Sequence, residues 1–348
     1  MHRFFRSLPA LALCAPVAVA CHASGDDDHA GAGGSSNAND ATGGSGTAAG
    51  GTPSTAAGGT PGTSGTTNTA GAAAGSLNAA GTTGGASADS DPIPPGNPCD
   101  TALYCDDFES YDTAPNGKWT PRTSSGSVAI DTTEHASGSK SVKFTTQAAS
   151  SATAMIRIQD PSIFPVPGNV FYGRMMFYVE SVPMQSVHWT MLEGLGIVPG
   201  QTYHALYRYG GQLPVTQGST FVGSQLMANY DTPDWYSDKS TPGSDCWHHA
   251  NGRVVPVATW TCVEWKFDGP NDGMKLWLDG VAAPDLTIAG HGDSNNGDGC
   301  VNANNNIPWA APSFASLDVG WESYQMDDPR TVYVDDVAIS TTRIGCPN

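Results

Sequence analysis

Hydrophobic and polar residues alternate with a period of two along much of the chain after residue 97. Clusters of Gly, Pro, Asn and Asp separate the alternating runs, which is typical of β-strands joined by turns. The predicted strands are Ser141–Thr146, Ala154–Ile158, Val170–Val179, Val187–Glu193, Thr202–Tyr209, Ser224–Tyr230, Thr261–Asp268, Met274–Leu278, Ser316–Trp321 and Val332–Ile339. About ten strands in about 250 residues favour two antiparallel sheets packed face to face. We therefore predict an all-β, two-sheet antiparallel jelly-roll sandwich.

The N-terminus has the pattern of an export signal. His2, Arg3 and Arg6 precede an apolar run, Leu8 to Ala20, that is too short to span a bilayer. The run ends in A-V-A-C and resembles a bacterial lipobox, which implies that residues 1–21 are a lipoprotein signal and that Cys21 is lipidated. The alternative is an ordinary secretory signal cut near Ala23. Both alternatives predict an exported protein, at the outer membrane or cell surface if lipidated and secreted otherwise.

Residues 22–97 are rich in Gly, Ala, Thr and Ser, with almost no large apolar side chain. Such a segment buries too little surface to offset the entropy of ordering, so we predict a disordered tether. Residues 98–348 are enough for one sizeable domain. We expect a monomer that contacts a membrane only through its lipid anchor.

Six of the eight cysteines lie in this domain, and an even number in an exported chain favours disulfides. They are Cys99, Cys105, Cys246, Cys262, Cys300 and Cys346. The sequence leaves their pairing open. A zinc site at Cys246, His248, His249 and Cys262 is the alternative, but the spacing fits no zinc finger.

The formal net charge is −18, and residues 98–348 carry 13 basic against 27 acidic side chains. No basic stripe is present, so we exclude a nucleic-acid partner. An anionic polysaccharide would need a local basic pocket.

Several motifs in order resemble the polysaccharide-lyase-like jelly rolls, which are concanavalin A-like and include the fungal cellulose-induced secreted protein and, more distantly, glucuronan and alginate lyases. The motifs are C-D-D-F-E (Cys105–Glu109), H-A-S-G-S-K-S (His135–Ser141), F-Y-G-R-M-M-F-Y-V (Phe171–Val179), W-T-C-V-E-W-K-F-D (Trp260–Asp268), K-L-W-L-D-G (Lys275–Gly280) and V-Y-V-D-D-V-A-I-S (Val332–Ser340). The resemblance spans roughly Cys99 to Cys346 and implies a polysaccharide as partner.

The resemblance also implies a structural Ca²⁺ ion where the first and last strands meet, because calcium takes six to eight oxygen ligands. The matching ligands are Glu109, oxygens near Ser137 and Lys140, and Asp336. The alternative is that Glu109 and Asp336 are solvated charges at strand ends.

A lyase acting on a uronic acid needs a base for the C5 proton, an acid for the leaving oxygen, and groups that neutralise the carboxylate. Alternation puts His188 opposite Val187, Trp189 and Met191, and puts Arg208 on a face with His204. We predict His188, Arg208 and Tyr230 as catalytic residues. The predicted substrate-binding residues are His204, Gln225, Glu264 and Tyr207. Tyr207 and Tyr230 are also compatible with packing, and Tyr230 and Gln225 need a bulge to share one face.

Two other functions are considered. A glycoside hydrolase would use a pair of carboxylates such as Glu264 and Glu193, although Glu193 faces the core if its strand is regular. A non-catalytic binding module would stack sugars on aromatic side chains, with Trp189, Trp277, Trp321 and Tyr324 as candidates. β-Elimination of a uronic-acid polymer is the first hypothesis, and binding without cleavage is the second.

Overall fold

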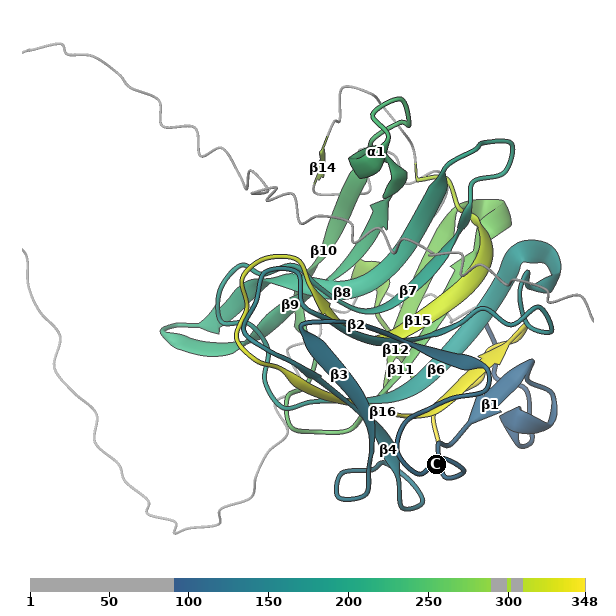
Figure 1. The fold of residues 1–348 in the computed structure, drawn as a ribbon, viewed down its shortest axis with the longest axis vertical. Helices are drawn as coiled ribbons and strands as arrows, with labels where there is room; N and C mark the ends of the chain where they lie inside the picture. Colours follow the sequence, from purple (N-terminus) through teal and green to yellow (C-terminus); the bar gives the residue numbers. More distant parts are fainter. Residues whose placement is uncertain (1–90, 289–298, 302–308, 348) are drawn as a thin grey trace, which may run out of the picture. The chain divides into compact units, whose positions relative to one another are not determined.

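The computed structural model describes residues 91–288, 299–301 and 309–347, and it is an all-β sandwich (Figure 1). The predicted lipidation site Cys21, the signal and all but the last residues of the predicted tether lie outside the described residues. The strands are β1 (Tyr104–Asp106), β2 (Trp119–Ser124), β3 (Gly126–Asp131), β4 (Ser141–Thr146), β5 (Thr153–Ile158), β6 (Val170–Val179), β7 (Trp189–Ile197), β8 (His204–Gln217), β9 (Thr220–Asp231), β10 (Asp245–Val254), β11 (Thr261–Asp268), β12 (Gly273–Leu278), β13 (Val281–Ala282), β14 (Gly299–Val301), β15 (Ser313–Ser323) and β16 (Thr331–Ser340).

The single α-helix in the described part of the chain is the short α1 (Asp234–Ser237), between β9 and β10. Short 3-10 turns lie at Pro98–Asp100, Pro167–Asn169, Gly269–Asn271 and Pro284–Leu286. No helix among the described residues is long and apolar enough to cross a membrane.

The strands form two antiparallel sheets. Sheet A has the order β13-β12-β11-β6-β16-β4-β3, and β1 pairs with β16. Sheet B has the order β14-β10-β9-β8-β7-β15-β5-β2. This arrangement confirms the predicted fold class. The sequence pattern missed β10, because its run D-C-W-H-H-A-N-G-R lacks a regular apolar alternation.

Aromatic side chains from both sheets meet in the core. Phe267 of sheet A lies 5.7 Å from Tyr207 and 5.4 Å from Phe314 of sheet B, measured between ring centroids. Trp189 and Trp321 stack at 4.6 Å within the core face of sheet B. Aromatic pairs of this kind contribute packing energy beyond the area that they bury. Because these aromatic side chains occupy the inner face of sheet B, the polar side chains lie on its outer face.

A register shift in β7 decides the direction of its side chains. The shift lies between Thr190 and Leu192, so Met191 and Leu192 both enter the core and Glu193 lies on the outer face. A regular strand would have placed Glu193 in the core, and the shift explains why it lies on the outer face. A β-bulge inserts one residue and re-aims every side chain after it.

The first described residue, Asp91, lies against the outer face of sheet A. Its carboxylate accepts a hydrogen bond from the Tyr172 hydroxyl at 2.8 Å, forms an ion pair with Lys275, and lies 3.6 Å from the Lys266 ammonium. Arg343 of the C-terminal segment donates to the Asp91 carbonyl at 3.4 Å. These contacts hold Asp91, near the end of the predicted tether, beside the C-terminal segment.

Candidate functional site

An ion-pair network covers the outer face of sheet B. The strand register aligns Asp318, Glu193, Arg208 and Asn229 in one row across four strands. Arg122 and Arg157 join this row from β2 and β5. The members are Arg122, Arg157, Arg208, Glu193, Asp231, Asp318 and Glu322. Charged side chains are rarely buried unless they are paired. Each carboxylate of this network has at least one arginine partner.

Arg208 lies at the centre of the network and is 7% exposed. Its Nε donates to Glu193 Oε2 at 3.0 Å, and its Nη1 donates to Asp231 Oδ2 at 3.0 Å and to Asn229 Oδ1 at 3.2 Å. The planar guanidinium suits several fixed acceptors at once. Arg208 is thereby oriented by both neighbouring strands, β7 and β9.

Tyr324 joins Arg208 to His188. The Arg208 Cζ atom lies 5.3 Å from the centroid of the Tyr324 ring, and the His188 ring lies 4.5 Å from the same ring. The Tyr324 hydroxyl donates to Glu322 Oε2 at 3.2 Å and lies 3.1 Å from Thr190 Oγ1. The predicted convergence of His188 and Arg208 is thus present, with Tyr324 in contact with both.

His188 is a neutral imidazole at physiological pH. Burial lowers the pKa of His188 to about 3, and the positive charge of Arg208 and the nearby His249 add to this effect. Its Nε2 is buried and has no hydrogen-bond partner among the described residues. Its backbone is fixed, because its N–H donates to Gln325 Oε1 at 2.6 Å and its carbonyl accepts from Tyr324 N at 3.0 Å. An oriented ring with an unused nitrogen can accept a proton or a ligand hydrogen bond.

The carboxylates of the network differ in their proton affinity. Burial raises the pKa of Asp231 to about 7, and the carboxylate of its register partner Asp245 acts in the same direction. Burial and the charge of Glu193 raise the pKa of Asp318 to about 6. Burial acts to raise the pKa of Glu193 too, but Arg208 and Arg122 overcome it and lower that pKa. The face therefore changes charge in the neutral pH range.

Two predicted site tyrosines lie elsewhere. Tyr230 and Tyr207 are fully buried in the core, where Tyr230 stacks on Trp309 at 5.9 Å. Both side chains alternate with the outward residues Asn229 and Arg208 on regular stretches of β9 and β8, so they point to sheet A. The assignments of Tyr230 to catalysis and of Tyr207 to substrate binding were wrong.

His204 and Gln225 lie on strands of sheet B, but their side chains contact residues other than His188, Arg208 and Tyr324. His204 is at the start of β8, and its Nδ1 is 2.9 Å from Asp234 Oδ2 beside α1. The Gln225 amide donates to the Ala250 carbonyl of β10. Neither side chain contacts His188 or Arg208.

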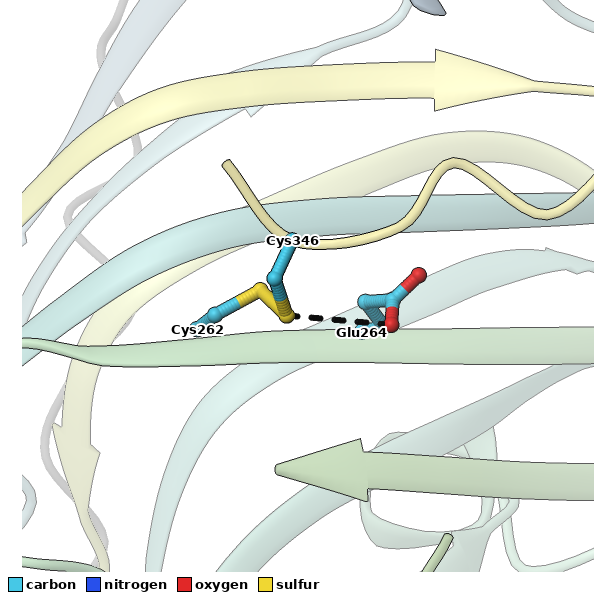
Figure 2. Close-up of side chains that lie close together, drawn as sticks. All are labelled: Cys262, Glu264 and Cys346. Carbon is cyan, nitrogen blue, oxygen red and sulfur yellow. Dashed lines mark hydrogen bonds between the residues drawn. A yellow bond between two sulfur atoms is a disulfide. The ribbon is translucent and has the colours of Figure 1, made fainter. Parts of the chain in front are cut away.

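Glu264 belongs to the other sheet and is 1% exposed (Figure 2). Its carboxylate accepts hydrogen bonds from Arg343 Nη2 at 3.1 Å and from Gly345 N at 2.6 Å. Figure 2 also shows Cys346 Sγ, which is 3.8 Å from Glu264 Oε2. Glu264 points away from the core, but the C-terminal segment covers it. Glu264 is therefore neither a substrate ligand nor a partner of Glu193 in hydrolysis.

Disulfides join Cys99 to Cys105 and Cys262 to Cys346. Cys246 is also disulfide-bonded, and its register partner on β14 is Cys300, whose side chain lies outside the described residues. The alternative of a zinc site at Cys246 and Cys262 was wrong, because disulfide sulfurs are not available as thiolate ligands.

Of the four aromatic side chains considered for sugar stacking, one lies on the polar face of sheet B. Trp189 and Trp321 are in the core, and Trp277 is 1% exposed on sheet A, where the Arg343 guanidinium lies 4.5 Å from its ring centroid. Tyr324 alone of the four lies on the polar face of sheet B and is partly exposed. The sequence pattern gave no reason to join it to His188, because it follows β15 and is distant in sequence.

The calcium ligands implied by the resemblance do lie near one another. Glu109 Oε1 accepts from the backbone N–H groups of Ser139 and Lys140, at 2.7 and 2.8 Å. The Ser137 hydroxyl donates to Asp336 Oδ1 at 3.0 Å, so the loop between β3 and β4 contacts both carboxylates. Both oxygens of the Glu109 carboxylate already accept hydrogen bonds from Ser139 and Lys140, so calcium at this junction stays a prediction. The Lys140 ammonium points instead to the carbonyls of Glu109 and Tyr111, at 2.9 and 2.7 Å, so Lys140 could contribute only a backbone oxygen.

Comparison with known proteins finds a similarity to one family over the central and C-terminal strands. Residues 222–342 match the family model of the polysaccharide-lyase-like, Cip1-like core domain. The resemblance inferred from the sequence motifs is confirmed. This match supports a carbohydrate-active protein.

Among solved structures, the chain is similar to the cellulose-induced protein Cip1, with 23% identity over 70% of this chain and 100% of that chain and a TM-score of 0.48. It is also similar to an endo-β-1,4-glucuronan lyase from the fungus Trichoderma reesei, with 14% identity, 70% and 96% coverage and a TM-score of 0.46. The alginate lyase AlyC3 matches at 8% identity, 57% and 74% coverage and a TM-score of 0.33. The curated proteins gave no match.

Proposed function

We propose that this protein is an exported polysaccharide lyase that cleaves a uronic-acid polymer by β-elimination on the outer face of sheet B. The observation that carries the proposal is the contact of Tyr324 with both His188 and Arg208. A base, a proton donor and a cation are the three groups that β-elimination beside a carboxylate requires.

His188 would take the C5 proton on its unpartnered Nε2, which is buried in the free protein and would be uncovered when the polymer binds. The low pKa of this histidine makes it a weak base in the free protein. A substrate carboxylate bound beside it would raise that pKa, because a nearby negative charge stabilises the imidazolium. Substrate binding would thus strengthen the base where it is needed.

Tyr324 would donate its hydroxyl proton to the leaving oxygen. Burial raises the pKa of Tyr324 well above its usual range, so the hydroxyl stays protonated before substrate binds. Its hydrogen bond to Glu322 Oε2 holds the oxygen in place; after cleavage the proton on His188 would pass to water and Tyr324 would regain one from water. Arg208 and, at the rim, the partly exposed Arg122 would face the substrate carboxylate.

Binding without cleavage is the second candidate, and one observation favours it. Arg208 is already neutralised by Glu193 and Asp231, and Arg122 by Glu193, Asp318 and Glu322. A cation with such partners attracts a uronate less strongly than a free one. A polymer could therefore lie on this face without its C5 proton becoming acidic.

The test is absorbance near 235 nm during incubation of the full-length protein with glucuronan, alginate, pectin and xylan, because β-elimination leaves an unsaturated uronate. A rise in absorbance is expected with a uronate polymer. His188→Ala should lower the rate at least about 100-fold without lowering the melting temperature. His135→Ala, an exposed histidine in the loop before β4, is the matched control and should keep the full rate.

The absence of any rise, with retention of one polymer in an affinity gel, would replace the lyase by a binding protein. A drop in melting temperature for His188→Ala would make this residue structural. Export and acylation of Cys21 belong to the same proposal, and the two disulfides among the described residues suit an oxidising compartment.

A further inference from the structure

A polar cavity lies on sheet A, where β1 pairs with β16. Its volume is about 450 Å³, within the range of small-ligand sites. The lining includes Tyr104, Asp107, Ser110, Tyr111, Arg174 and Asp336. The cysteines of the Cys99–Cys105 disulfide also line it. None of these residues belongs to the strands that carry His188, Arg208 and Tyr324.

Arg174 gives this cavity unused hydrogen-bond donors. The side chain comes from β6, is 7% exposed, and donates only to two backbone carbonyls, Asp336 O at 3.4 Å and Gly345 O at 3.3 Å. No carboxylate oxygen of the described chain lies within ion-pair distance of it, and its Nη2 donates to no described residue. Burial lowers the pKa of Arg174, and the more distant charges of Asp336 and Glu264, which act in the opposite direction, do not overcome it. An unpaired buried guanidinium is costly, so a ligand that brings oxygen acceptors would be stabilised here.

The C-terminal disulfide holds one of the two carbonyls that orient Arg174. Gly345 donates its N–H to Glu264 at 2.6 Å, and the next residue, Cys346, is bonded to Cys262 (Figure 2). The guanidinium is therefore fixed by a segment that cannot move away easily.

The tyrosines of the cavity are fixed as acceptors. The hydroxyls of Tyr104 and Tyr111 both donate to Asp106 Oδ2, at 2.6 and 2.7 Å, and Trp119 Nε1 donates to the same oxygen at 2.9 Å. With their protons directed at Asp106, the two hydroxyl oxygens keep lone pairs for a ligand. Burial and the charge of Asp106 raise the pKa of Tyr111 to about 12, so it stays neutral.

The charges of the lining select the class of ligand. Asp106, Asp107 and Asp336 bring three carboxylates to a cavity with one guanidinium, so an anionic group would meet net repulsion. Sugar hydroxyls both donate and accept hydrogen bonds, and they match a lining that mixes Arg, Asp, Ser and Tyr. We propose that the cavity binds one pyranose unit of a neutral polysaccharide, with Arg174 donating to ring hydroxyls and Asp107 and Asp336 accepting from them.

The test is titration of the full-length protein with D-glucose, D-xylose, D-mannose, their β-1,4-linked dimers and D-glucuronate, followed by ligand-observed NMR and calorimetry. The titrations are run with added Ca²⁺ and with a chelator, because Asp336 is also a candidate calcium ligand. We expect a neutral sugar to bind, and Arg174→Met to weaken it at least about tenfold. Arg174→Met should keep or raise the melting temperature, since it removes an unpaired buried charge.

Ser110→Trp blocks the cavity without touching Arg174. Ser110 is exposed, and Ser219→Trp in the exposed β8–β9 turn is the matched control. Loss of binding in Ser110→Trp but not in Ser219→Trp supports the proposal, and so does unchanged sugar binding in His188→Ala. Stronger binding of glucuronate than of any neutral sugar, binding that survives Ser110→Trp, or no binding at all would each overturn it. None of these results depends on lyase activity.

Discussion

Arg208 and Glu193 form a buried ion pair across β7 and β8, with Nε and Oε2 3.0 Å apart. Glu193 is 2% exposed and also pairs with Arg122. The pair exists because the register shift in β7 turns Glu193 out of the core and opposite Arg208. This irregularity in β7 therefore adds Glu193 to the polar face of sheet B.

Removal of the Glu193 charge should destabilise the protein strongly. Glu193→Gln leaves Arg208 and Arg122 with fewer charged partners, and breaking a buried pair typically costs about 3–5 kcal/mol. Urea unfolding would show this loss, whereas Glu180→Gln at an exposed site should change stability by less than about 0.5 kcal/mol. The double variant Glu193→Gln with Arg208→Met should lose less than the sum of the single variants. Additive losses would show that the two residues are not coupled.

Asp231 should make stability fall as the pH rises. Its folded pKa of about 7 lies above the usual value for an unfolded aspartate, so between about pH 4 and pH 7 the folded state binds more protons than the unfolded state. The free energy of unfolding contributed by Asp231 therefore declines across this window. Asp231→Asn keeps an acceptor for Arg208 and removes the titration, so its melting temperature should exceed that of the unmodified protein more at pH 7.5 than at pH 5.

His188 acts with the opposite sign, because its pKa of about 3 lies below the unfolded value. Its contribution makes stability rise with pH between about pH 3 and pH 6.5. The comparison of Asp231→Asn with the unmodified protein at each pH cancels this effect. An equal difference in melting temperature at both pH values would contradict the assignment to Asp231.

If calcium binds where the loop before β4 contacts Glu109 and Asp336, it should stabilise the folded protein. Chelation is expected to lower the melting temperature, and Ca²⁺ but not Mg²⁺ should restore it, because Mg²⁺ demands a smaller octahedral site. Asp336→Asn should abolish the response to the chelator. A melt that is unchanged by chelation would remove calcium from this site.

The two described disulfides should differ in their effect on stability. Cys262 and Cys346 are 84 residues apart in sequence, whereas Cys99 and Cys105 are 6 apart. A cross-link that closes a longer loop removes more entropy from the unfolded chain. Replacing Cys262 and Cys346 by Ala should cost about 4 kcal/mol, more than the same change at Cys99 and Cys105. Equal losses in denaturant unfolding would point to local strain rather than chain entropy.

The period-two pattern was sufficient for the fold class and for most of the long strands, but it missed β10 and the edge strands β2 and β3. On β8 it separated Arg208 from Tyr207 correctly, because the strand is regular there and one face is buried. The same alternation already placed Tyr207 opposite Arg208, so its assignment to the binding site conflicted with the pattern. The outward direction of Glu193 requires a bulge, and alternation alone does not locate it between Thr190 and Leu192.

Contacts between distant segments account for the other differences. Tyr324 reaches His188 only because β15 pairs with β7, and the sequence does not specify which strands pair. Glu264 looked accessible because its strand pattern points it outward, but Arg343 and Gly345 cover it from the end of the chain. Local periodicity indicates a direction relative to the sheet, and it says nothing about what a later segment places on top.

The clamp on Asp91 has a practical consequence for attachment. Tyr172, Lys266, Lys275 and Arg343 hold this residue on the outer face of sheet A, while His188, Tyr324 and Arg208 lie on the outer face of sheet B. A bead or a fusion partner joined to the chain ahead of Asp91 is thus connected at the outer face of sheet A, which is opposite to the face that carries His188.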